Sequence, residues 1–130
     1  MARVSFDSGV LIALDRGEAR AWGWHRRAVE RGEAPVVSAA AVTEAWRDGR
    51  RQARLAAALQ VCDIQLVDEP LARRAGEALA STGADNPVDA LVAATAAREG
   101  ALLVTGDAGD MLELAERHFR GLRVASLRGK

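Results

Sequence analysis

The sequence has one cysteine, two histidines and no tyrosine, and these shortages exclude several kinds of site. Because Cys62 has no partner within the chain, an intrachain disulfide is impossible and a disulfide-stapled scaffold is excluded. His25 and His118 lie far apart and have no cysteine partner, so the ligand pattern of a zinc site is missing. The side chains that remain in quantity for chemistry are carboxylates.

Lysine is almost absent, because Lys130 is the only one and every other basic residue is arginine. A P-loop needs a lysine within a glycine-rich loop, and the chain contains no such motif. A receiver-type phosphorylation domain typically needs an internal lysine as well. The composition therefore excludes a P-loop nucleotide site and disfavours a receiver.

The sequence has neither a net charge nor a long apolar run. Eighteen acidic and eighteen basic residues cancel, which excludes a uniformly basic nucleic-acid coat but leaves room for local basic surfaces. No apolar run reaches the roughly 18 residues of a membrane span, and the apolar run at the start is too short for a signal peptide. We expect a cytoplasmic protein without a membrane partner, folded as a single domain over residues 1–130.

Short apolar runs alternate along the chain with longer segments of helical periodicity. We expect strands at 4–6, 36–38, 64–67, 102–104 and 122–125. We expect helices at 8–14, 19–31, 39–58, 71–80, 87–98 and 111–119, with an interruption of the third near Gly49. This alternation predicts an α/β fold whose central sheet is mainly parallel.

Acidic residues follow several of the expected strands. Asp7 comes directly after the first strand, Glu44 lies in the helix after the second, and Asp89 lies in the first turn of the helix at 87–98. Asp107 and Asp110 follow the strand at 102–104. Because ligand sites of parallel sheets form beyond the carboxyl ends of the strands, we expect these acids to converge.

Each acid has an ordinary alternative, such as a helix-start acid for Asp89 or an ion pair with Arg47 for Glu44. Those alternatives require that four acids lie near the same edge of the sheet by chance. A cluster of bare carboxylates is unfavourable, and a divalent cation relieves the repulsion. Oxygen ligands without thiolate or imidazole favour Mg²⁺ or Mn²⁺.

Three segments carry a family resemblance. Residues 7–11 read DSGVL, residues 37–44 read VSAAAVTE, and residues 88–96 read VDALVAATA before GALLVTGD at 100–107. In order and spacing they resemble the PIN domain family of metal-dependent ribonucleases, especially the VapC-type toxins of bacterial toxin–antitoxin pairs. The similarity covers nearly the whole chain.

The resemblance implies a PIN-like three-layer fold with a mainly parallel central sheet flanked by helices. It assigns catalysis and metal binding to Asp7, Glu44, Asp89 and Asp107. It adds Asp110 as a ligand, direct or through water, and Ser8 and Thr105 as hydroxyls that steady the ligands. Many of the toxins have arginine and phenylalanine where this chain has Gly106 and Met111, which leaves open whether Asp107 or Asp110 is the closer ligand.

The same resemblance implies an Mg²⁺- or Mn²⁺-dependent endoribonuclease that leaves 5′-phosphate and 3′-hydroxyl ends on RNA. It also implies a cognate VapB-type antitoxin and a homodimer. Two other classes stay open: a catalytically silent PIN-fold binding module, and an aspartate-based phosphatase or phosphotransfer domain. The second is disfavoured because no further acid closely follows Asp7 and no internal lysine exists.

Arginines and tryptophans are the candidates for contact with RNA. Four arginines have the spacing of one helix face, provided that the helix continues past Gly49: Arg47, Arg50, Arg51 and Arg54. Such a row suits RNA phosphates, and a solvated helix face is the equal alternative. Tryptophans can stack on unpaired bases, but we expect Trp22, Trp24 and Trp46 mainly in the core.

Overall fold

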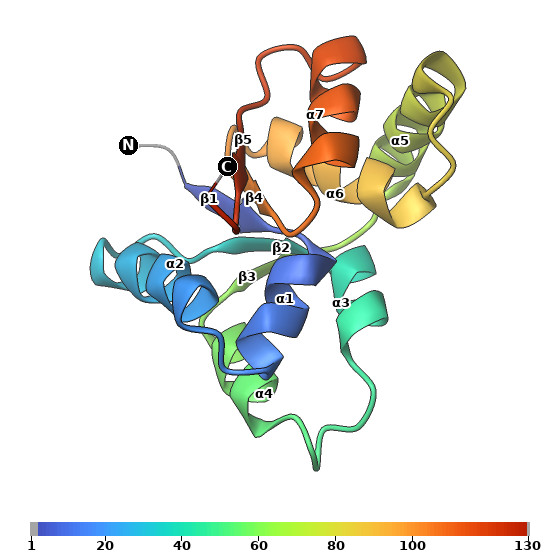
Figure 1. Ribbon diagram of the computed structural model, residues 1–130. Helices are drawn as coiled ribbons and strands as arrows, with labels where there is room; N and C mark the ends of the chain where they lie inside the picture. Colours follow the sequence, from blue (N-terminus) through green and yellow to red (C-terminus); the bar gives the residue numbers. More distant parts are fainter. Residues whose placement is uncertain (1–2, 130) are drawn as a thin grey trace.

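The computed structural model describes residues 3–129, and a five-stranded sheet forms its centre (Figure 1). The strands are β1 (Val4–Phe6), β2 (Val36–Ser38), β3 (Asp63–Gln65), β4 (Leu102–Thr105) and β5 (Val124–Ser126). Their order is β3-β2-β1-β4-β5, and every neighbouring pair is parallel. The predicted α/β class with a parallel central sheet is confirmed.

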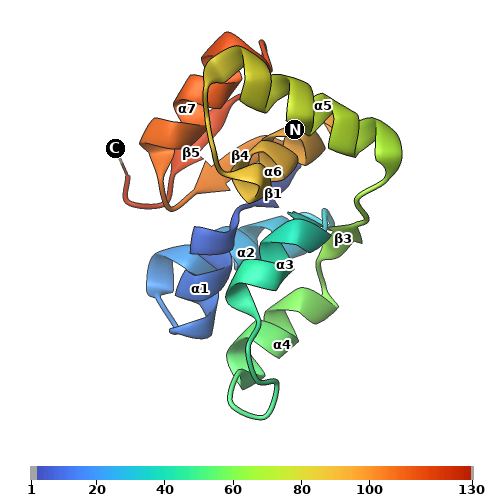
Figure 2. The same ribbon diagram turned by 90° about the vertical axis from the view of Figure 1, so that its right-hand side faces the viewer.

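Helices cover both faces of this sheet. They are α1 (Ser8–Asp15), α2 (Ala19–Glu30), α3 (Ala39–Ala45), α4 (Ala53–Gln60), α5 (Glu69–Thr82), α6 (Pro87–Arg98) and α7 (Ala108–Arg117). Figures 1 and 2 show α1 to α4 on one side and α5 to α7 on the other. Right-handed crossovers explain this division, because the chain moves from β1 to β3 toward one edge and from β4 to β5 toward the other.

The core lies on both faces of the two central strands. Every residue of β1 and of β2 is buried, as expected where helices cover both sides of a sheet. The helix α6 is buried mainly through small side chains, so α3, α5 and α7 all contact it. This packing holds α6 in place, with its first turn at the carboxyl edge of the sheet.

The segment expected to be helical at 39–58 is two helices, and the interruption expected near Gly49 is confirmed as the loop between Ala45 and Ala53. α3 ends at Ala45, because Trp46 adopts an extended backbone conformation. The buried Gln52 side chain then organises the loop: its Oε1 accepts from the N–H of Arg47 at 2.7 Å and of Asp48 at 2.9 Å. Its Nε2 donates to the Ala45 carbonyl at 2.9 Å. A single side chain thus satisfies three backbone groups freed by the break.

The third strand is shifted relative to the prediction of 64–67. β3 pairs with β2 over three residues, from Asp63 opposite Val36 to Gln65 opposite Ser38. Ser38 is also the cap of α3, so β2 offers no further partner to the chain beyond Gln65. Leu66 is 75% exposed for that reason.

The remaining elements lie close to their predicted ranges. β5 ends one residue later than expected, α5 is longer at both ends, and α7 begins at Ala108 instead of 111. None of the helices of the described residues is both long enough and apolar enough to cross a bilayer.

Candidate active site

A pocket opens at the carboxyl ends of β1 and β4, where the strand order reverses. The connection after β1 runs on one face of the sheet and that after β4 on the other, which leaves a crevice between them. The acids that line it are Asp7, Glu18, Glu44, Asp89, Asp107 and Asp110. The structure therefore brings together all five carboxylates singled out from the sequence.

Asp7 is fixed between the two strands. Its Oδ1 accepts a hydrogen bond from the N–H of Val10 at 3.0 Å, which caps α1. The hydroxyl of Thr105 donates to Oδ2, and the N–H of Gly106 lies 3.2 Å from both oxygens. Asp7 is 5% exposed, and its burial raises the pKa of the carboxyl although these hydrogen bonds lower it.

Two glycines let β4 approach α1 closely at this point. A Cβ on Gly106 would lie 3.2 Å from the Cα of Gly9, and a Cβ on Gly9 would lie 3.1 Å from the Cα of Gly106. Both contacts are with backbone, which cannot rotate away. At this close approach the N–H of Gly106 reaches the carboxylate of Asp7.

Glu44 reaches the pocket from the opposite side, from α3. The hydroxyl of Ser8 donates to its Oε1 at 2.6 Å. Arg47 does not pair with Glu44, since its guanidinium donates to the carbonyls of Thr43 and Trp46. The alternative of a simple Glu44–Arg47 ion pair is therefore wrong.

Asp89 lies in the first turn of α6, which Asn86 caps. The Asn86 side chain accepts from the N–H of Val88 at 3.0 Å and of Asp89 at 3.2 Å. Burial is the largest cause that raises the pKa of Asp89, to about 6, and the negative charges of Asp7 and Glu44 are the next causes. The charged form of Asp89 is therefore disfavoured, first by burial and then by the neighbouring negative charges.

Asp107 and Asp110 enter the pocket from the start of α7. The hydroxyl of Thr105 accepts from the N–H of Asp107 at 2.9 Å, so one threonine contacts the segments of both Asp7 and Asp107. The charge of Asp107 raises the pKa of the exposed Asp110. Both side chains line the pocket, so the geometry leaves the order of the two as ligands open.

The donor set suits a hard divalent cation. In residues 3–129, no three His, Cys, Asp or Glu side chains lie close enough together to hold a metal ion as they are placed. Burial first, and then the negative charges of the neighbouring acids, raise the pKa of Asp89, and a bound cation would offset both effects. Carboxylate oxygens are the ligands that Mg²⁺ and Mn²⁺ prefer.

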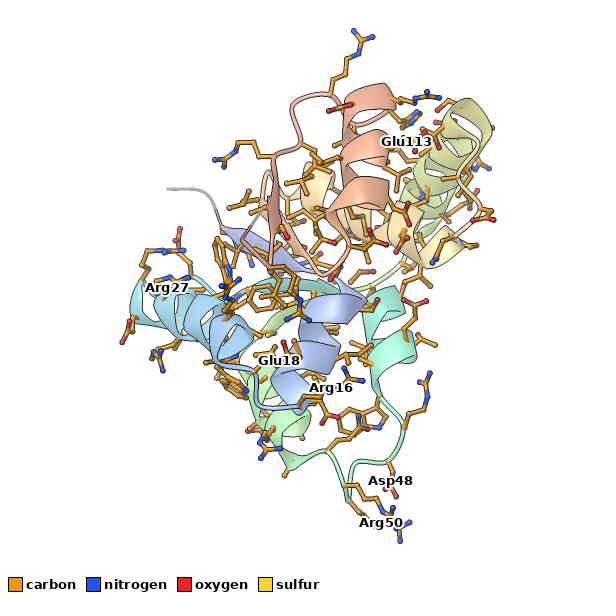
Figure 3. The ribbon with its side chains drawn as sticks, in the orientation of Figure 1. Arg16, Glu18, Arg27, Asp48, Arg50 and Glu113 are labelled. Atoms are coloured by element: carbon orange, nitrogen blue, oxygen red, sulfur yellow. The ribbon has the colours of Figure 1, made fainter. Side chains whose placement is uncertain are left out.

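Two arginines that line the pocket were not predicted from the sequence. Arg16 lies at the end of α1, and Arg128 follows β5 and pairs with Glu18 (Figure 3 labels Arg16 and Glu18). Arg128 comes shortly after the strand at the edge of the sheet, so the rule that led to the acids would have found it. Arg16 gave no such signal, because only the turn between α1 and α2 brings it to the pocket.

The four arginines predicted to share a helix face do not share one. Arg47, Arg50 and Arg51 lie in the loop between α3 and α4, and only Arg54 lies on α4. Figure 3 shows Asp48 and Arg50 at the tip of this loop. None of the four lines the acidic pocket, because the break after Ala45 directs the chain away from it.

The sequence of this chain matches a known protein family. The family model described as the PIN domain matches residues 4–116. This chain belongs to the PIN domain family. The predicted family is thus confirmed, and membership places the chain among proteins that are generally nucleases.

Solved structures share this PIN fold at low sequence identity. A toxin–antitoxin complex from Klebsiella pneumoniae is 21% identical, with a TM-score of 0.69 over 95% of this chain and 97% of that one. FitAcB from Neisseria gonorrhoeae is 18% identical, with a TM-score of 0.68 over 96% and 98%. VapBC2 from Rickettsia felis, bound to a DNA fragment from its promoter, is 16% identical, with a TM-score of 0.70 over 95% and 97%. No curated protein sequence matches this chain.

Proposed function

We propose that this PIN domain is an Mg²⁺- or Mn²⁺-dependent endoribonuclease. The observation that carries the proposal is the convergence of five carboxylates on one pocket, where burial and mutual repulsion raise the pKa of Asp89 to about 6. A pocket in which negative charge is unfavourable is suited to bind a cation. The bound cation would in turn contact a phosphodiester.

Each residue of the pocket has a role in this proposal. The metal would be held by Asp7, Glu44, Asp89 and Asp107, with Asp110 as a further ligand, direct or through water. When bound, it would supply Lewis acidity to a water molecule and to the scissile phosphate. Ser8 and Thr105 orient their carboxylate partners by hydrogen bonds, and no side chain of the protein needs to act as nucleophile.

We further propose that the protein is the toxin of a VapBC-type pair. Support comes from the solved structures of similar fold, which are named as toxin–antitoxin assemblies and are covered almost completely by this chain. A cognate VapB-type antitoxin and a homodimer belong to the same proposal. A small reading frame directly upstream of the gene would support the pairing.

The test is cleavage of labelled total RNA by the purified protein with Mn²⁺ or Mg²⁺. The variants are Asp89→Asn and Glu44→Gln, with Glu116→Gln as the matched control, because Glu116 is an exposed acid of α7 outside the pocket. We expect the wild type and the control to cut, and both pocket variants to lose at least about a hundredfold in rate. EDTA should abolish the cutting.

Other outcomes separate the alternatives. Equal cutting by Asp89→Asn would mean that the site is misplaced or that the activity is a contaminant. If the wild type cuts no RNA, calorimetry with Mn²⁺ decides: a protein that does not bind Mn²⁺ either would contradict the nuclease proposal and favour a silent binding module. Hydrolysis of an aryl phosphate monoester would instead favour a phosphatase.

A further inference from the structure

A second groove runs along α2 beside the segment that follows β5. We call it the α2 groove, and its lining includes Arg20, Trp24, Arg26, Arg27, Leu127 and Gly129. Among residues 3–129, no acidic side chain lines it. In a chain with no net charge, this is a local concentration of one sign.

The arginines of the α2 groove are available for a ligand. Arg20, Arg26 and Arg27 are exposed, and none of them pairs with a carboxylate within the described part of the chain. Other surface arginines do pair with a carboxylate, as Arg73 does with Glu69. Guanidinium groups that pair with no carboxylate are suited to phosphate oxygens.

The spacing on α2 combines these charges with an aromatic surface. Arg20, Trp24 and Arg27 follow one another at four and three residues, so they share one helix face. The guanidinium of Arg27 lies over the Trp24 ring, with its Cζ 5.2 Å from the ring centroid. A flat guanidinium and indole surface of this kind can stack on an unpaired base.

The chain after β5 forms the other wall and joins the groove to the acidic pocket. Gly129 has a positive φ of 84°, and a Cβ there would lie 3.2 Å from Nη1 of Arg20, so the tail passes close to that side chain. Arg128 turns the opposite way and pairs with Glu18, and both line the acidic pocket. The Arg128–Glu18 pair therefore stands between the two hollows.

Electrostatics explains why a nuclease needs such a groove. Six carboxylates line the pocket, and they repel the phosphates that flank a scissile bond. A cation in the pocket would offset this repulsion at the scissile phosphate, and arginines beside the pocket can contact the flanking phosphates. The α2 groove supplies such arginines from a surface contiguous with the pocket, whereas the arginines of the α3–α4 loop do not line either hollow.

We propose that the α2 groove binds single-stranded RNA next to the scissile phosphate, with Arg20, Arg26 and Arg27 on the backbone and Trp24 under an unpaired base. This assignment rests on the proposed nuclease function and names where its substrate strand leaves the pocket. Figure 3 shows Glu18 near the turn between α1 and α2, and Arg27 further along α2, so the strand would follow that helix.

The test measures binding of a fluorescein-labelled, 12-nucleotide single-stranded RNA of mixed sequence to the full chain. All proteins carry Asp89→Asn, so that the probe stays intact, and Arg20→Gln/Arg27→Gln is compared with Arg73→Gln/Arg117→Gln. The control pair lies on α5 and α7 and removes the same charge. Since all four arginines are exposed, we expect every variant to fold, as circular dichroism would verify.

We expect the groove variant to bind at least about tenfold more weakly than the control, with a salt-dependence slope smaller by about 1.4. Trp24→Leu should weaken binding by about tenfold without changing that slope. If RNA binds but the groove variant matches the control in affinity and slope, the assignment of the groove is overturned while the nuclease proposal stands. If the Asp89→Asn chain binds no RNA even at low salt while the wild type cuts none, both fall.

Discussion

At the scale of single residues, the negative charge of Asp89 destabilises the metal-free folded protein. Its pKa of about 6, against a usual 3.8, means that the folded protein binds its proton more tightly than the unfolded chain does. The folded state without metal is therefore penalised as the pH rises from about 4 to about 6, and the full penalty is present at neutral pH.

Replacing Asp89 with asparagine should stabilise the metal-free protein. The rise in pKa sets an upper limit of about 3 kcal/mol. Solvent screening of a half-buried group and the loss of an acid at a helix start reduce the expected gain in unfolding free energy to roughly 1 kcal/mol at pH 7. Urea unfolding in EDTA should show this gain at pH 7 and little difference near pH 4. A variant that is less stable than the wild type at pH 7 would contradict the electrostatic account.

At the scale of elements, the site depends on how closely β4 approaches α1. The approach is closest at Gly9 and Gly106, where backbone meets backbone. It allows the N–H of Gly106 and the hydroxyl of Thr105 to hold Asp7 from the neighbouring strand. The geometry of the acids is thus set by the docking of two elements.

Gly106→Ala should destabilise the protein by about 1–3 kcal/mol, because the new methyl group would force β4 and α1 apart. Gly76→Ala is the matched control: Gly76 lies within α5, and a Cβ there meets nothing within 4 Å. The control should gain about 0.5–1 kcal/mol from helix propensity. Thermal unfolding of the two variants checks the opposite signs, and equal shifts would contradict the proposed close packing.

At the scale of the whole molecule, the acidic pocket couples a cation to global stability. The five proposed ligands come from the residue after β1, from α3, from α6 and from the start of α7, so both helical layers take part. Binding to the folded state alone stabilises it by mass action.

Mn²⁺ at about 100 times its dissociation constant should therefore add roughly 2.7 kcal/mol to the unfolding free energy, or about 10 °C in Tm. Differential scanning fluorimetry measures the shift. In Asp89→Asn it should be much smaller, because one charged ligand is gone. A full shift in that variant would place the cation outside the pocket.

Much of the fold and of the site could be predicted from local patterns. Alternating apolar runs gave the parallel α/β class, and positions beyond strand ends or at a helix start gave five of the six acids of the pocket, all except Glu18. The prediction failed where a contact distant in sequence decides, as at β3, which spans Asp63–Gln65 instead of 64–67 because it pairs with Val36–Ser38 of β2.

The sequence by itself thus determined the class of fold and the family, because strand and helix periods and the order of the acids are local properties of the chain. Only the tertiary structure decided which surfaces adjoin the acidic pocket. The arginines of one apparent helix face were dispersed by a loop, while Arg128, Glu18 and the α2 groove met there from opposite ends of the chain. Such proximity follows from the crossovers and the packing of elements, which no short stretch of sequence specifies.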